Sequence, residues 1–284
     1  MIFIAILIVI VLMIFLIMIW TLQRKILFYP TLDHTWEPTT EYKEVMINDE
    51  LSAWHFDRYP KAKTILFCHG NSGNISLYEH IIDLVDQQKL NLLIFDYHGY
   101  GKSKGHPSPQ GICIDGEMAY QYLLEYGLSP CDILVWGESL GGAVATYVAS
   151  KHPCHTLILM STFSSLDDTL SDINRFTPRM LSYICLLVTH PLPSRKWIGF
   201  VQCPIVIVHS KDDEVIPYCN AQRLFDAIPH NDKKLITTLG KHTNPILTRE
   251  DMNELASFCN FPCKYTNSMI RNLRGLHERF CIKC

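Results

Sequence analysis

The sequence predicts an α/β fold with a mostly parallel, doubly wound sheet, preceded by an N-terminal transmembrane helix. Apolar runs of about five residues, rich in isoleucine, leucine and valine, recur along the chain. Helix-like segments alternate with these runs, which is typical of a parallel sheet covered by helices on both faces. The first twenty residues are all apolar and predict the anchor.

The predicted anchor comprises residues 1–20. At about 1.5 Å per residue, twenty helical residues reach roughly 30 Å, which is the thickness of the hydrocarbon core of a bilayer. A cleaved secretory signal is the alternative interpretation. It is disfavoured because no charged residue precedes the run, the run is too long, and no small-residue cleavage site follows it.

The strand-like runs are nearly continuous, as expected for strands buried on both faces of a sheet. They are Thr64–Cys68, Leu90–Phe95, Ile133–Trp136, Thr156–Met160, Pro204–Val208 and Lys234–Thr238. The helix-like segments between them are Ile75–Gln88, Gly111–Tyr126, Gly141–His152 and Asn220–Ile228. The mixed segment 21–60 is expected to add edge strands. In such folds the functional groups lie at the carboxyl ends of the strands.

The charge and cysteine content of the chain exclude some classes of function. The formal net charge is −3 and the 25 lysines and arginines are scattered, which is not the electrostatic footprint of a nucleic-acid-binding protein. The eleven cysteines are spread along the chain, so we expect most thiols to be reduced. A zinc site is one interpretation of the spacing near the end, and unlinked thiols are the favoured one; these cysteines are Cys259, Cys263, Cys281 and Cys284. No metal or organic cofactor is expected.

A serine stands between glycines where the run from Ile133 ends and a helical segment begins, in the order Gly137-Glu138-Ser139-Leu140-Gly141. A sharp strand-to-helix turn forces its central residue into a strained conformation and projects the side chain from the top of the sheet. The helix N-terminus there favours negative charge. Ser139 is therefore the candidate nucleophile.

A serine nucleophile needs a base, and the base needs a carboxylate that orients it. The acidic cluster 212–214 follows one predicted strand and His242 follows the next, which gives the order Ser, acid, His. A solvated turn and an ordinary loop histidine are the alternative interpretations. An oxyanion hole would use the backbone N–H of Leu140 and, from the glycine-rich loop after Cys68, that of Asn71; a simple glycine turn is the alternative.

The motifs together resemble the α/β-hydrolases, and more narrowly the membrane-anchored serine hydrolases of the abhydrolase domain-containing protein 13 and 17 type. The matching pieces are ILFYP at 26–30, HGNSGNIS at 69–76, FDYHGYGKSKGHPS at 95–108, WGESLGGAVA at 136–145, STFSS at 161–165, DEVIP at 213–217 and GKHTN at 240–244. The resemblance implies that Asp213, rather than Asp212, is the catalytic acid. Two positions depart from the family: His98 stands where arginine is usual, and Glu138 where a basic or polar residue is common.

The predicted organisation is an anchor at 1–20, an α/β-hydrolase domain at 21–260 and a basic amphipathic tail at 261–284. Such hydrolases carry a short lid between two late strands, here about 161–202, whose core at 180–188 is strongly apolar. An ordinary packed helix is the alternative for this insertion. The tail is interpreted as a helix lying on an anionic membrane surface, with packing on the domain or a disordered end as alternatives.

The sequence thus predicts a membrane-anchored serine hydrolase, an esterase or thioesterase of the EC 3.1 class, that cleaves an acyl ester, thioester or amide through Ser139, Asp213 and His242. Its partners would be the bilayer and an acyl-containing small molecule, lipid or lipidated protein. The alternatives are a catalytically silent hydrolase-fold binding module and a serine peptidase of related fold. Arg24 and Lys25 after the anchor favour a cytosolic hydrolase domain, whereas resemblance to the type 13 proteins implies the opposite side.

Overall fold

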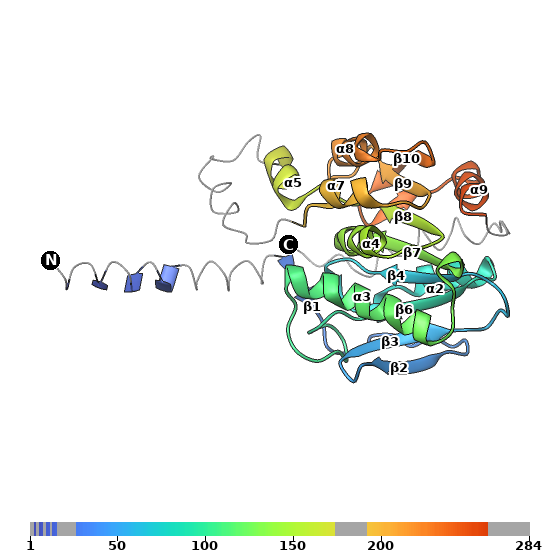
Figure 1. Cartoon of the computed structure of the whole chain (residues 1–284), viewed down its shortest axis with the longest axis horizontal. Coiled ribbons are helices and arrows are strands. Elements are labelled where there is room, and N and C mark those ends of the chain that lie inside the picture. The colour runs from blue at the N-terminus through green and yellow to red at the C-terminus, as the bar shows by residue number, and fades with distance from the viewer. Residues whose placement is uncertain are drawn as a thin grey trace.

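The computed structural model describes residues 27–173 and 192–260, together with isolated positions between residues 3 and 15. A twisted sheet runs through the described part, and helices lie against both of its faces (Figure 1). The strand order is β11-β10-β9-β8-β7-β4-β6-β3-β2. In this spatial order, the six neighbouring strands from β10 through β4 to β6 are parallel, and antiparallel pairs occur at both ends of the sheet. The α/β fold with a mostly parallel sheet is therefore confirmed.

The strands of this sheet are β2 (Lys43–Ile47), β3 (Leu51–Phe56), β4 (Thr64–Cys68), β6 (Asn91–Phe95), β7 (Ile133–Glu138), β8 (Thr156–Met160), β9 (Ile205–Ser210), β10 (Lys233–Lys241) and β11 (Asn244–Ile246). Two short strands, β1 (Tyr29–Pro30) and β5 (Ser72–Gly73), pair separately. The α-helices are α2 (Glu79–Gln87), α3 (Pro109–Glu125), α4 (Leu140–Lys151), α5 (Leu166–Ile173), α7 (Ser194–Trp197), α8 (Cys219–Ala227) and α9 (Arg249–Phe258).

The core divides into two apolar clusters, one on each face of the sheet. Alternate residues of β7 show the division, because Ile133 and Val135 belong to one cluster while Leu134 and Trp136 belong to the other. Helices α3, α4 and α8 pack on the first face, and α2 and α9 pack on the second. Burial on both faces explains why the central strands appear in the sequence as unbroken apolar runs.

The structure differs from the sequence prediction in two segments near the site. The helix predicted from Ile75 is interrupted: a 3₁₀ turn covers Ile75–Leu77, and α2 starts after Tyr78. The side chain of Asn74 accepts a hydrogen bond from Ser76 N–H and so fixes this turn. The last predicted strand continues beyond Thr238 as β10 and returns through a two-residue turn into β11, which was not predicted.

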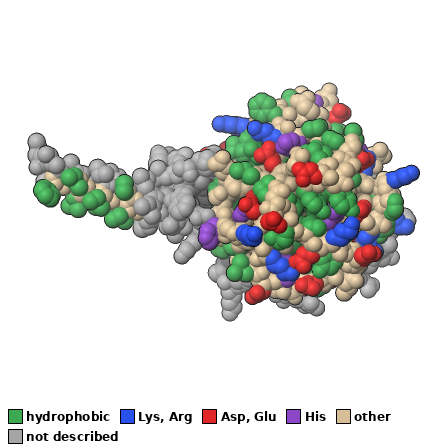
Figure 2. All heavy atoms as spheres, turned by 60° about the horizontal axis from the view of Figure 1, so that its bottom comes forward, with side chains coloured by type: hydrophobic (Ala, Val, Ile, Leu, Met, Phe, Trp, Pro, Cys, Tyr) green, Lys and Arg blue, Asp and Glu red, His purple; other side chains and the backbone are tan. Residues whose placement is uncertain are grey.

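Several predicted features fall outside the described residues: most of the anchor at 1–20, the apolar core of the lid at 180–188 and the tail at 261–284. Within the part of the chain that the structure describes, no helix has the length and apolar character needed to cross a bilayer. Acidic and basic side chains are interspersed on the face shown in Figure 2, in agreement with the scattered charge of the sequence.

Candidate active site

Ser139 lies in the tight turn between β7 and α4, in a backbone conformation that side chains rarely adopt. Its φ is 53° and its ψ is −118°, and a positive φ is uncommon for a residue with a Cβ. The neighbouring glycines permit this turn. A Cβ on Gly137 would lie 2.2 Å from the carbonyl oxygen of Gly141, and one on Gly141 would lie 1.9 Å from that of Cys68. The turn therefore has the strained, closely packed form that the sequence predicts.

The structure brings Ser139, His242 and Asp213 together from three separate elements. His242 Nε2 lies 3.0 Å from Ser139 Oγ, and His242 Nδ1 lies 2.8 Å from Asp213 Oδ2. An ionised carboxylate can only accept, so the Nδ1 proton is donated to Asp213 and the lone pair of Nε2 faces the serine hydroxyl. In this tautomer the imidazole is ready to take the serine proton.

Asp213 is held as an acceptor by the turn after β9. Its Oδ1 accepts hydrogen bonds from the N–H groups of Val215 and Ile216, at 2.9 and 2.7 Å. Burial acts to raise the pKa of Asp213, but the hydrogen bonds and charge of His242, with the Ile216 N–H, outweigh it and hold the pKa below its ordinary value. The adjacent Asp212 is exposed. Of the two neighbouring carboxylates, only Asp213 contacts the imidazole.

His242 occupies the two-residue turn of the β10–β11 hairpin, where Lys241 pairs with Asn244. Its backbone N–H donates to Glu214 Oε2 at 3.1 Å. The imidazole is therefore positioned by a hairpin at the edge of the sheet, and not by a loop that leads directly into a helix. Only 11% of its side chain is exposed.

The loop after β4 approaches the nucleophile. A Cβ on Gly70 would lie 3.7 Å from Ser139 Cβ, so the peptide that follows it, which carries the Asn71 N–H, is close to the serine. Among the hydrogen bonds of the described residues, none is donated by the N–H of Asn71 or of Leu140. Within the part of the chain that the structure describes, both N–H groups therefore lack an acceptor, as the donors of an oxyanion hole must.

Three tyrosine hydroxyls fix this loop, and sequence reasoning did not identify them. Tyr97 donates to the His69 carbonyl at 2.9 Å and Tyr100 donates to the Asn71 carbonyl at 2.7 Å. The intervening peptide N–H donates to the Tyr78 hydroxyl at 2.8 Å. Two of the tyrosines belong to the matching piece at 95–108, which is the signal that could have revealed them. These three hydrogen bonds, here called the tyrosine frame, hold the loop in one conformation.

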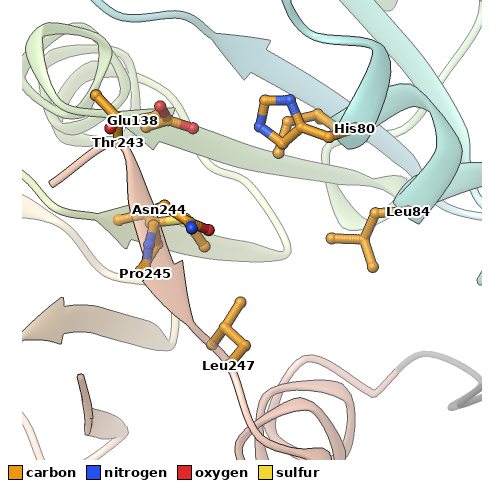
Figure 3. Close-up of a pocket in the computed structure, with 9 residues that line it drawn as sticks. His80, Leu84, Glu138, Thr243, Asn244, Pro245 and Leu247 are labelled. Atoms are coloured by element: carbon orange, nitrogen blue, oxygen red, sulfur yellow. The ribbon is translucent and has the colours of Figure 1, made fainter. Parts of the chain in front are cut away.

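Glu138, directly before Ser139, lines a pocket together with residues of α2 and of the β10–β11 hairpin (Figure 3). Burial among protein atoms raises the pKa of this carboxyl to about 7, with His242 acting in the opposite direction. No hydrogen bond contributes to the pKa. Near neutral pH this carboxyl is therefore partly protonated, unlike an ordinary glutamate.

Replacing Glu138 with glutamine is expected to raise the melting temperature at pH 8 and to leave it almost unchanged at pH 4. The carboxyl binds its proton more tightly in the folded chain, so its contribution is most favourable below about pH 4.5 and is lost as the pH rises through about 7. The ionised form costs at most about 3 kcal/mol, and less because the side chain is partly exposed. Calorimetry across this pH range measures the difference.

The exposed Glu79, replaced with glutamine, is the matched control for the loss of one negative charge. The melting temperature of the Glu79→Gln protein at pH 8 should not rise, because Glu79 lies in the first turn of α2, where a negative charge favours the helix. A Glu138→Gln variant whose difference from the unmodified protein does not change with pH would contradict the raised pKa of the carboxyl.

Metal chemistry has no visible ligand set in this region. Among the described residues, no group of three histidine, cysteine, aspartate or glutamate side chains is arranged to hold a metal ion. Of the four cysteines near the end of the chain, only Cys259 is described, and it is a buried free thiol. The other three lie outside the described residues.

Comparisons with known proteins place these features in a family. Residues 63–191 match the family described as alpha/beta hydrolase fold. An uncharacterized membrane protein of Saccharomyces cerevisiae is 30% identical over 205 residues, covering 70% of this chain and 71% of its own length. Alpha/beta hydrolase domain-containing protein 17C of Mus musculus is 28% identical over 197 residues, covering 69% of this chain and 59% of its own length.

Among solved structures, an esterase of Pyrococcus furiosus superposes with a TM-score of 0.67 at 20% identity, covering 82% of this chain and 97% of the esterase. At this identity the likeness concerns the fold. Two other findings show the family as well as the fold. Residues 63–191 match the family model, and the yeast relative is 30% identical, with 71% of its length covered by this chain. The chain belongs to the α/β-hydrolase family.

Proposed function

We propose that the chain is a membrane-anchored serine hydrolase that cleaves an acyl ester, thioester or amide through an acyl-enzyme intermediate. The contact chain from Ser139 Oγ through the His242 imidazole to Asp213 is the observation that carries the proposal. Family membership supports hydrolase activity in general. Fold alone does not define the substrate, so the proposal rests on the geometry of these side chains.

The first half of the reaction forms the acyl-enzyme. Ser139 Oγ attacks the acyl carbonyl carbon while His242 Nε2 takes the hydroxyl proton. Asp213 keeps the imidazole in the required tautomer and stabilises the imidazolium that forms. The carbonyl oxygen becomes an oxyanion, which accepts hydrogen bonds from the N–H groups of Asn71 and Leu140. His242 then gives its proton to the leaving group as the bond to that group breaks.

The second half repeats these roles with water. His242 takes a proton from a water molecule, the resulting hydroxide attacks the acyl carbon, and the second oxyanion uses the same two N–H donors. Collapse of this intermediate returns the proton to Ser139 Oγ and releases the carboxylic acid. No step in this sequence needs a group beyond water and the residues named.

The acyl group is proposed to be a long chain, from a lipid or a lipidated protein. The twenty apolar residues at the start would hold the domain at a bilayer, and one relative is named a membrane protein. The apolar stretch 180–188, which lies outside the described residues, would supply an apolar wall for the acyl chain of the substrate. The cytosolic orientation is part of the proposal, supported by Arg24 and Lys25.

A panel of substrates on the full chain in detergent micelles tests the proposal. Nitrophenyl esters and acyl-thioesters with chains from acetyl to palmitoyl should be hydrolysed, with kcat/KM rising at least tenfold toward the longer chains because apolar area is buried. Short-chain esters at several detergent concentrations control for micelle partitioning. Preference for short, water-soluble acyl groups would contradict the substrate class, cleavage of peptides alone would support the peptidase, and no hydrolysis at all would support a silent binding module.

A further inference from the structure

Two cysteines from separate connections lie against each other at the edge of the sheet opposite the nucleophile. The sulfur atoms of Cys154 and Cys203 are 3.3 Å apart, although the residues are 49 positions apart in the chain. Cys154 precedes β8 and Cys203 precedes β9, and these strands are parallel neighbours (Figure 1). The pair therefore lies at the amino ends of two strands, whereas Ser139 follows the carboxyl end of β7.

The two thiols need only a small movement to form a disulfide. An S–S bond is about 2.0 Å long, so the sulfurs must approach each other by roughly 1.3 Å. Both residues lie in the connections before their strands, which begin at Thr156 and Ile205. A small shift of these connections can close the gap while β8 and β9 stay paired. Within the part of the chain that the structure describes, this is the one pair of thiols joined by a hydrogen bond.

One of the two sulfurs is prepared to react as a thiolate. The thiol of Cys154 donates a hydrogen bond to Cys203, and the backbone N–H groups of Leu157 and Cys203 act in the same direction. Together they hold the pKa of Cys203 below its ordinary value, against the effect of burial. The same hydrogen bond and burial raise the pKa of Cys154, which keeps its proton. By contrast, burial and nearby acids raise the pKa of Cys113 to about 12.

We propose that Cys154 and Cys203 form a reversible oxidation site, at which a peroxide converts the two thiols into a disulfide that closes the segment 154–203 into a loop. The Cys203 thiolate attacks one oxygen of hydrogen peroxide, the O–O bond breaks and hydroxide leaves, which gives a sulfenic acid. Cys154 Sγ then attacks the Cys203 sulfur, the S–O bond breaks, and the departing hydroxide takes the Cys154 proton to form water. The two thiols lose two electrons, which reduce the peroxide to water. A dithiol reverses the change.

The closed loop contains residues that support the nucleophile. The Ser139 N–H donates to the Met160 carbonyl at 3.0 Å, and Thr162 Oγ1 donates to the Ser139 carbonyl at 2.7 Å. The five residues of β8, which extend roughly 16 Å, separate these contacts from the cysteines. Closing the loop lowers the conformational entropy of the unfolded chain. The oxidised protein is therefore expected to resist unfolding, while the geometry at Ser139 stays the same.

Peptide mapping of the full chain in detergent micelles tests the oxidation site. The protein is treated with hydrogen peroxide, the remaining thiols are alkylated, and digestion is carried out without a reductant. The expected product is a linked pair of peptides containing Cys154 and Cys203, two hydrogens lighter than the separate peptides and separated again by dithiothreitol. Cys131→Ser, which removes an exposed thiol, should leave this link unchanged. Oxidation of Cys203 to a sulfinic acid without a link, or a link from either residue to another cysteine in its place, would overturn the proposal.

The melting temperature tests the effect of the link. Peroxide should raise it by at least about 5 °C in the unmodified protein, and dithiothreitol should restore the original value. Cys154→Ser and Cys203→Ser should show no rise, and Cys131→Ser should show the full rise. The same change in every protein, or a link without a rise, would overturn the proposal. Neither readout depends on hydrolysis, so the outcome is independent of the proposed function.

Discussion

Replacing Ser139 with alanine is expected to lower kcat/KM for acyl esters by about four to six powers of ten. Alanine keeps the Cβ, so the strained φ of 53° and the packing of the turn stay the same, and only the hydroxyl 3.0 Å from His242 Nε2 is lost. Initial rates with a nitrophenyl ester measure the effect, and the melting temperature should change little.

Ser161 offers a matched control for this variant. It directly follows the neighbouring strand β8, is buried and also has a positive φ, of 47°, and no hydrogen bond joins it to His242 among the described residues. Ser161→Ala should therefore keep most of the activity. A Ser139→Ala protein that retains more than about one per cent of the original rate would contradict the assignment of the nucleophile.

The second large effect concerns the two neighbouring carboxylates. Asp213→Asn is expected to reduce kcat about ten-thousand-fold, because its amide can donate to His242 Nδ1 and favour the tautomer with the proton on Nε2. Asp212→Asn should cost less than about threefold, since this side chain is exposed. Rates for both variants with one ester, measured over a range of pH, make the comparison.

Asp213 also accepts two backbone hydrogen bonds, so its replacement is expected to reduce stability. Rates are therefore compared at a temperature where both variants are folded by circular dichroism. Equal losses in the two variants, or a larger loss for Asp212→Asn, would show that the acid had been assigned to the wrong residue.

The central sheet was predictable because its strands are buried on both faces. Thr64–Cys68 and Thr156–Met160 are unbroken apolar runs, and their bounds agree with β4 and β8. The β10–β11 hairpin was not predictable in this way. From Ile236 onward β10 alternates between buried and more exposed residues. β11 is an edge strand of three residues that contains a proline. Proline has no N–H to donate to a neighbouring strand, so it weakens the sequence signal for a strand.

One missed helix had a readable signal. Helix α9 begins with a capping box, in which the side chain of Thr248 accepts from the backbone N–H of Asp251 and the side chain of Asp251 accepts in return from that of Thr248. A threonine followed three residues later by an acid is a sequence-level sign of a helix start.

One part of the candidate site could likewise be predicted from the local sequence, and another part could not. The turn around Ser139 is encoded locally, since its glycines are needed for close approach within a few residues. The choice between Asp212 and Asp213 is not local, because it depends on which carboxylate meets a histidine about thirty residues further on, and only the family resemblance indicated it. The tyrosine frame and the Glu138 pocket join residues distant in sequence, and no spacing rule connects them.

The most direct test of the account is the site of covalent labelling by a fluorophosphonate probe, because such a probe reacts with a serine that a histidine base activates. Intact mass followed by peptide mapping of the labelled full chain locates the adduct. One adduct is expected, on Ser139, and it should be absent from the Ser139→Ala protein and form far more slowly in a His242→Ala protein. An adduct on another serine, or undiminished labelling of the Ser139→Ala protein, would contradict it.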